Sequence, residues 1–200
     1  MAEKQTDEQL MQDVAAGSGR ALDSLMQRWR GSVWCFIDRM CRRDDTDDLY
    51  QEVWTRLYRY RKRYKPSKPF RPYLFAIVVN TCRSALRQKE PWVLESLGDS
   101  DPLADPVEAA DPLTRAIRKE QSVALRRAIH QLPPAQREVM LLYLICSNDH
   151  LTIASALGKR PASVRTTMHR ALQRLRSTLR YFTTPSREVH HETQSNPTTG

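Results

Sequence analysis

Apolar residues recur at intervals of three and four positions along both halves of the chain, which is the period of a helix with one buried face. Residues 22–40 show this period most regularly. Their apolar positions are Leu22, Leu25, Met26, Trp29, Val33, Phe36, Ile37 and Met40. Gly17 and Gly19 separate this segment from a shorter predicted helix over residues 7–16. The pattern predicts an all-α fold.

A second regular segment, residues 48–59, has one apolar and one polar face. It follows acidic residues within positions 44–47, which suit the positive end of a helix dipole. At 100° per residue, one side carries Leu49, Tyr50, Val53, Trp54, Leu57 and Tyr58. The other side carries Asp48, Gln51, Glu52, Thr55, Arg56 and Arg59. We expect this polar face to remain free for a partner.

Residues 60–71 form a basic, aromatic segment stiffened by prolines, and a predicted helix follows from Pro72. One stripe of that helix carries Asn80, Arg83, Ser84 and Arg87. Cationic side chains follow phosphates and aromatic rings stack on bases, so the combination fits single-stranded nucleic acid. A solvated loop between core helices is the alternative.

The C-terminal part has the pattern of a helix-turn-helix. A predicted helix over residues 113–131 ends at two prolines, and Pro134 can open the next helix. A short helix then leads to a turn at Gly158 and a longer helix from Pro161. The buried stripe of that last helix is predicted to be Val164, Met168, Ala171, Leu172, Leu175 and Leu179. Its polar outer face fits the major groove of DNA, whereas a plain helical bundle would not need a basic face.

Charge divides the 200-residue chain into segments, and its overall excess of 32 basic over 23 acidic residues gives a net +9. Residues 1–89 hold 18 basic and 11 acidic residues, and residues 113–200 hold 14 and 5. Residues 90–112 hold seven acidic residues, no basic residue and four prolines. This composition predicts two basic helical domains joined by an acidic flexible linker.

Residues 182–200 are polar and aperiodic, and we expect a disordered tail. The basic excess favours an anionic partner.

Other function classes find little support in the residues. The four cysteines form no CxxC pair, so reduced thiols in a cytosol are expected. No apolar run is long enough to span a bilayer, and the N-terminus lacks the features of a signal peptide. These features predict a soluble intracellular protein.

An enzyme is the weaker alternative. Asp44, Asp45, Asp47, Asp48 and Glu52 resemble a divalent-metal cluster of a helical nuclease. No histidine accompanies them, and the charge at a helix N-terminus explains the acids. We therefore expect no catalytic activity, no metal site, no cofactor and no small-molecule substrate.

Four motifs in order resemble the sigma-70 family of bacterial sigma factors, and more narrowly its extracytoplasmic-function (ECF) group. They are DLYQEV at 48–53, FRPYLFAIVVN at 70–80, Leu132-Pro133 with Arg137, and IASALG followed by SVRTTMHRALQRLR. The resemblance covers roughly residues 6–180. It implies a region 2-like domain over 1–89, a linker over 90–112, and a region 4-like helix-turn-helix domain over 113–181.

The resemblance also implies residue roles in the first domain. Asp48, Gln51, Glu52 and Arg56 are expected to bind the polymerase core on its β′ subunit. The loop residues Tyr64, Lys65, Ser67, Lys68 and Phe70 are expected to capture an extruded base of the minus-ten element, with Asn80 and Arg83 on the helix that presents this loop. Tyr73 stands where the family commonly has tryptophan.

In the second domain, the resemblance assigns the minus-thirty-five element to Ser163, Arg165, Thr166, His169 and Arg170. The implied function is to bind core RNA polymerase (β′ and β), direct it to promoters and help melt the minus-ten element. An anti-sigma factor is a further implied partner, and the bacterial cytoplasm the implied location. The alternative is a helix-turn-helix regulator that binds its operator without polymerase.

Overall fold

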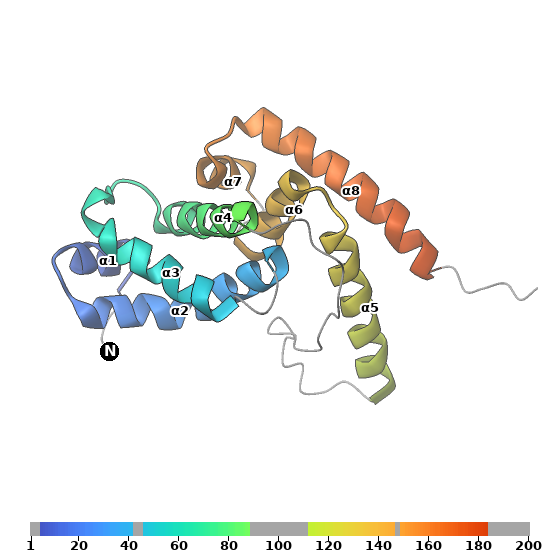
Figure 1. Cartoon of the computed structure of the whole chain (residues 1–200), viewed down its shortest axis with the longest axis horizontal. Helices are drawn as coiled ribbons and strands as arrows, with labels where there is room; N and C mark the ends of the chain where they lie inside the picture. The colour runs from blue at the N-terminus through green and yellow to red at the C-terminus, as the bar shows by residue number, and fades with distance from the viewer. Residues whose placement is uncertain (1–4, 42–45, 89–111, 147–148, 184–200) are drawn as a thin grey trace, which may run out of the picture.

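The computed structural model describes residues 5–41, 46–88, 112–146 and 149–183, and each regular element in these ranges is helical (Figure 1). The all-α prediction is confirmed. The predicted linker, residues 90–112, lies outside these ranges except for Pro112, which begins a helix. The predicted tail, residues 182–200, overlaps the last helix, which extends to Thr183, and residues 184–200 lie outside the described ranges.

The N-terminal domain, residues 5–88, consists of helices α1 (Asp7–Ala15), α2 (Gly19–Met40), α3 (Thr46–Arg59) and α4 (Phe70–Gln88), with a 3-10 turn η2 (Arg61–Arg63). The Thr6 hydroxyl accepts from the Gln9 amide and the Gln9 side chain accepts from the Thr6 amide, so a capping box starts α1. Fully buried side chains from different helices meet in one core, among them Leu25, Phe36, Leu57 and Phe75. Phe75 packs edge-on against Trp29 and Phe36.

Helix α4 begins at Phe70, two residues before the predicted start at Pro72. A proline in the first turn removes no helical hydrogen bond, because the first amides of a helix have no partner within it. Pro72 therefore lies inside the helix and does not begin it.

The C-terminal domain, residues 112–183, contains α5 (Pro112–His130), α6 (Pro134–Leu141), a π-helical turn η3 (Leu142–Cys146), α7 (His150–Leu157) and α8 (Pro161–Thr183). Asp149 caps α7 by accepting from the amides of Leu151 and Thr152. Gly158 ends α7 in the left-handed conformation, with φ 62°. The helix-turn-helix prediction is confirmed by α7, this turn and α8.

The two domains pack directly on each other, which the sequence did not predict. Helix α7 lies against α4, and α2 contacts both α6 and η3 (Figure 1). Arg83 of α4 forms two hydrogen bonds of 2.7 Å with the carboxylate of Glu138 in α6. The Arg71 side chain donates to the backbone oxygen of Cys146 at 2.6 Å. The cores of the two domains are therefore continuous.

Candidate polymerase and promoter interfaces

The outer face of α3 is polar and accessible, as predicted. Asp48 and Gln51 are exposed, and Glu52 is half-buried beside Arg56, whose Nε lies 2.6 Å from Glu52 Oε1. On the opposite side Val53 and Leu57 have no exposed surface. Substitutions on the outer face therefore leave the core packing intact. Tyr58, placed on the apolar side by the sequence pattern, is 39% exposed, so that assignment was wrong.

Two tyrosine–arginine pairs extend the exposed surface beyond α3. The guanidinium of Arg61 lies 4.0 Å from the ring centre of Tyr58, and that of Arg63 lies 4.8 Å from the ring centre of Tyr60. Such distances are typical of cation–π contacts. The surface beside the loop 65–69 thus carries both aromatic rings and cationic side chains.

The loop between Tyr64 and Phe70 displays some predicted residues and buries others. Lys65, Ser67 and Lys68 are exposed, whereas Tyr64 is 7% exposed and Phe70 has no exposed surface. The Tyr64 hydroxyl donates to the backbone oxygen of Lys68 at 2.6 Å. Its ring packs on Phe70 and, with centres 5.0 Å apart, on Tyr73. In this structure the rings of Tyr64 and Phe70 are therefore not accessible to a base. They pack beneath the exposed loop residues and support the loop.

Burial raises the pKa of Tyr64 to about 12, and the nearby carboxylates of Glu8 and Asp7 act in the same direction. The phenol therefore stays protonated and remains a hydrogen-bond donor to Lys68.

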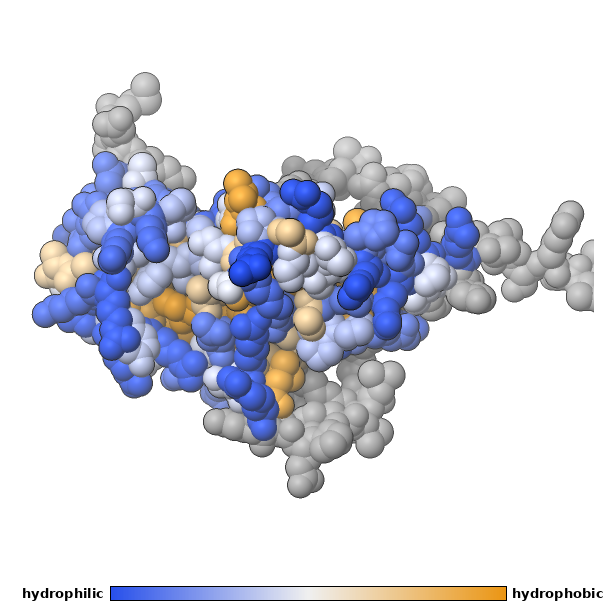
Figure 2. Space-filling model, turned by 90° about the horizontal axis from the view of Figure 1, so that it is seen from above, coloured by the Kyte–Doolittle hydropathy of each residue, from blue (hydrophilic) through white to orange (hydrophobic). Residues whose placement is uncertain are grey.

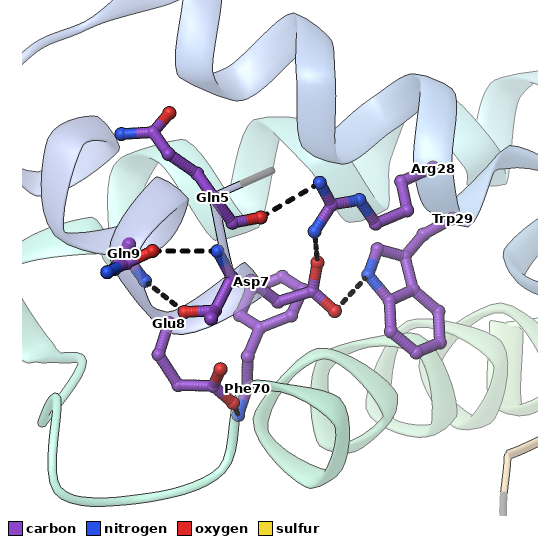
Figure 3. Close-up of polar contacts among 8 residues, drawn as sticks. Gln5, Asp7, Glu8, Gln9, Arg28, Trp29 and Phe70 are labelled. Atoms are coloured by element: carbon purple, nitrogen blue, oxygen red, sulfur yellow. Dashed lines mark hydrogen bonds and ion pairs between the residues drawn. The ribbon is translucent and has the colours of Figure 1, made fainter. Parts of the chain in front are cut away.

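Helix α1 forms contacts with the first residue of α4 and with α2 that the sequence did not reveal. The Glu8 carboxylate accepts the backbone N–H of Phe70 at 2.9 Å, and Asp7 accepts from the indole N–H of Trp29 at 3.0 Å (Figure 3). Asp7 also pairs with Arg28. Acidic residues in a first helical turn are expected from the helix dipole alone. Nothing local in the sequence marks a contact spanning 62 positions.

Asn80 and Arg83 share a stripe of α4, as predicted, but they differ in accessibility. Asn80 is exposed, whereas Arg83 is bound to Glu138, whose side chain is 5% exposed. Hydrogen bonding to Glu138 raises the pKa of Arg83. The Arg83 side chain is 30% exposed and binds Glu138 through Nε and Nη2, so only the remaining part of its guanidinium faces a partner while the pair is formed.

The outer face of α8 is exposed over its first turns. Ser163, Arg165, Thr166, His169 and Arg170 are all accessible to solvent. Val164, Met168 and Ala171 are buried on the other side. Leu172 is 37% exposed and so does not belong to the predicted buried stripe.

Figure 2 shows hydrophilic residues over most of the face in view, with apolar residues in a few separate places.

The described residues hold no cluster of three or more histidine, cysteine or acidic side chains suited to a metal ion. Asp44 and Asp45, part of the carboxylate cluster considered above, lie outside those residues. The four cysteines are buried and form no disulfide, and the Cys41 thiol donates to the backbone oxygen of Cys82 at 4.0 Å. Within the described ranges, none of the helices has the length and apolar character needed to cross a bilayer.

Comparison with known proteins accounts for both domains. The family model for Sigma-70 region 2 matches residues 25–91, and that for Sigma-70, region 4 matches residues 122–175. The sigma factor CarQ of Myxococcus xanthus is 29% identical over 84% of this chain and 95% of its own length. The ECF sigma factor ShbA of Streptomyces griseus is 31% identical over 66% of this chain and 70% of its own length.

Two solved structures share the fold. CnrH, solved in complex with the cytosolic domain of CnrY, superposes with a TM-score of 0.66 at 20% identity, covering 88% of this chain and 97% of CnrH. RpoE of Bartonella quintana, solved with the anti-sigma factor NepR, gives 0.60 at 17% identity, covering 79% and 96%. With the sequence matches, these results define a two-domain transcription initiation factor. The chain belongs to the ECF group of bacterial RNA polymerase sigma factors, which bind core polymerase and direct it to promoters.

Proposed function

We propose that this sigma factor uses three exposed sets of residues, one to bind polymerase and two to bind promoter DNA. One observation carries the proposal: the polar faces of α3 and α8 and the loop 65–69 are accessible, while the residues behind each are buried. Each set is therefore free to bind a partner without disturbing the core.

The outer face of α3, with Asp48, Gln51, Glu52 and Arg56, is assigned to the β′ subunit. The double variant Gln51→Ala/Glu52→Lys is expected to bind core polymerase weakly while keeping the urea stability of the parent protein. Asp23→Ala, which changes an exposed carboxylate on α2, is the matched control. Normal core binding by the double variant contradicts the assignment.

The loop 65–69 is assigned to unpaired minus-ten DNA. Lys65 and Lys68 would neutralise phosphates and Ser67 would hydrogen-bond. Asn80, exposed on α4 about 15 Å along the helix from Phe70, would contact the same DNA strand further on. Tyr64 and Phe70 serve as its buried support, a revision of the direct base contact first expected of them. Arg83 would contribute to the DNA surface with the part of its guanidinium that does not bind Glu138.

The first turns of α8 are assigned to the minus-thirty-five element through Ser163, Arg165, Thr166, His169 and Arg170. If Arg165 contacts a guanine edge bidentately, Arg165→Ala is expected to cost about 1–3 kcal/mol and relax discrimination at one or two positions. Arg176, exposed further along α8, is the matched control. Its loss should weaken binding to all sequences alike and lower the salt dependence. The measurement is holoenzyme binding to a promoter library at several salt concentrations.

The decisive test of the whole function is transcription in vitro with core polymerase on genomic fragments, with start sites mapped. Specific initiation is expected only when chain and core are combined. Specific DNA binding by the chain alone, without polymerase, would instead support the helix-turn-helix regulator considered above.

The remaining assignments follow from this role. Because two relatives of the same fold were solved with partner proteins, one of them named as an anti-sigma factor, we assign an anti-sigma factor to this chain as well. We further propose that this sigma factor works in the bacterial cytoplasm, where it would meet polymerase, and that it acts by binding, without catalysis or a cofactor. A purified inhibitor is expected to form a stable complex with the chain and to block its binding to core.

A further inference from the structure

Helix α4 has no capping residue of its own. It begins at Phe70, and the preceding residue is Pro69, whose side chain has no atom that can accept a hydrogen bond. The amide of Phe70 instead donates to the Glu8 carboxylate at 2.9 Å. An anionic group at this position also interacts favourably with the positive end of the helix dipole. Glu8 thus caps α4 from a different helix.

Neighbouring contacts fix Glu8 in place. Asp7, the residue before it, accepts from the Trp29 indole at 3.0 Å and pairs with Arg28, which also donates to the backbone oxygen of Gln5 at 3.0 Å (Figure 3). The Trp29 ring in turn packs against Phe70, with centres 6.2 Å apart. One turn of α1 is therefore joined to both α2 and the start of α4.

The cap lies at one end of the loop 65–69, and Tyr64 holds the other. The Tyr64 hydroxyl binds the Lys68 backbone oxygen, and its ring packs on Phe70. The exposed Lys65, Ser67 and Lys68 lie between these two anchored points. Hydrogen bonding from the Phe70 amide is the main cause of a lowered pKa at Glu8, so the cap is ionised at neutral pH.

We propose that Glu8 is a positioning residue for promoter melting: its carboxylate caps α4 and thereby holds the loop 65–69 in the shape that receives unpaired minus-ten DNA. The proposal rests on the function assigned above to that loop. It gives a role to α1, which precedes residue 25, where the match to Sigma-70 region 2 begins. The backbone at the loop's end is the part that Glu8 controls, because its hydrogen bond is to the Phe70 amide.

The test uses holoenzyme made with full-length Glu8→Ala, Glu8→Gln and the control Asp23→Ala. Open-complex formation is measured on a duplex promoter and on a template already mismatched across the minus-ten element. Glu8→Ala should slow opening of the duplex, and the stability cost of a typical helix cap sets about fivefold as the upper limit of this effect. The mismatched template should show a smaller loss, because no base pair has to open there before the loop receives the DNA. Glu8→Gln should recover most of the rate, since its amide oxygen can still accept from Phe70.

Hydrogen exchange of the Phe70 amide gives a readout that does not depend on DNA. This amide should exchange faster in Glu8→Ala than in the parent protein, while amides in the middle of α4 keep their protection. Equal loss on both templates, or no recovery in Glu8→Gln, overturns the positioning role. An unchanged exchange rate at Phe70 overturns the cap itself.

A failure of the loop assignment is distinguishable from a failure of this proposal. If Lys65→Ala/Lys68→Ala leaves melting of the duplex unchanged, the assigned function of the loop is wrong and the proposal falls with it. If that variant slows melting but Glu8→Ala does not, the loop assignment stands and only the role of Glu8 is rejected.

Discussion

In the C-terminal domain, the predicted promoter-facing residues lie between positions 163 and 170 of one helix, directly after the turn at Gly158. In the N-terminal domain, Glu8 of α1 binds the Phe70 amide at the end of the loop 65–69, and the Tyr64 hydroxyl binds the Lys68 backbone oxygen within it. The first surface is set by helical periodicity and a local turn. The second depends on a contact between Tyr64 and Lys68, four positions apart, and also on a contact between Glu8 and Phe70, 62 positions apart. Substitutions distant from the DNA are therefore expected to affect the two surfaces unequally.

The largest expected effect tests whether Phe70 supports the loop or contacts DNA. Phe70 has no exposed surface and packs on Trp29 and Tyr64, so Phe70→Ala should lower the free energy of unfolding by about 3–5 kcal/mol. Tyr60→Ala, at a ring that is 39% exposed, is the control and should cost far less. Urea denaturation measures both. A small cost at Phe70 would mean that its ring is free, as the sequence first indicated.

A smaller effect is expected at the contact between the domains. Arg83→Ala leaves the Glu138 carboxylate, 5% exposed, without its partner and should destabilise the protein by about 2–3 kcal/mol. The double variant Arg83→Ala/Glu138→Gln should recover part of the loss, because a neutral amide is less costly to bury than an unpaired carboxylate. Urea midpoints of the three proteins give the comparison. No recovery in the double variant would show that Arg83 acts on stability by another route.

Acid should weaken the C-terminal domain through protonation of His130 as the chain unfolds. Burial is the main cause that lowers the pKa of His130 to about 4, and the cation of Arg137 adds to it. Because the unfolded imidazole binds a proton below about pH 6.5, stability is lost as the pH falls from there toward 4. Between pH 7.5 and pH 5 the loss should be about 2 kcal/mol.

The variant His130→Gln isolates this contribution to acid stability. It should show a flatter dependence of the urea midpoint on pH over the same interval. The carboxylates of Glu8 and Asp149 also have lowered pKa values, but their contribution is lost only at lower pH, as they protonate. An equal pH slope in the variant and the parent protein would exclude His130 as the cause.

The helices and the outer faces of α3 and α8 were predictable because burial follows the helical period. Leu172 and Tyr58 show the limit of that inference, since a periodic position is buried only where another element covers it. The contact of Glu8 with the Phe70 amide and the pair Arg83–Glu138 were not predictable. They join residues 62 and 55 positions apart, and no local pattern encodes such a distance.

The smallest effect tests the locally determined turn of the C-terminal domain against a glycine of the N-terminal domain. Gly158 has φ 62°, and a Cβ added there meets no atom within 4 Å. The only cost of Gly158→Ala is therefore backbone strain, which should lower the free energy of unfolding by about 1 kcal/mol. Gly31 lies inside α2 with equally open space around its Cα. Gly31→Ala should therefore stabilise the protein by about 0.5–1 kcal/mol, since alanine restricts the unfolded chain and favours the helix. Opposite signs in urea denaturation are the expected result. Stabilisation by Gly158→Ala would mean that the turn before α8 does not need the left-handed conformation, and that the promoter-facing helix is positioned by packing alone.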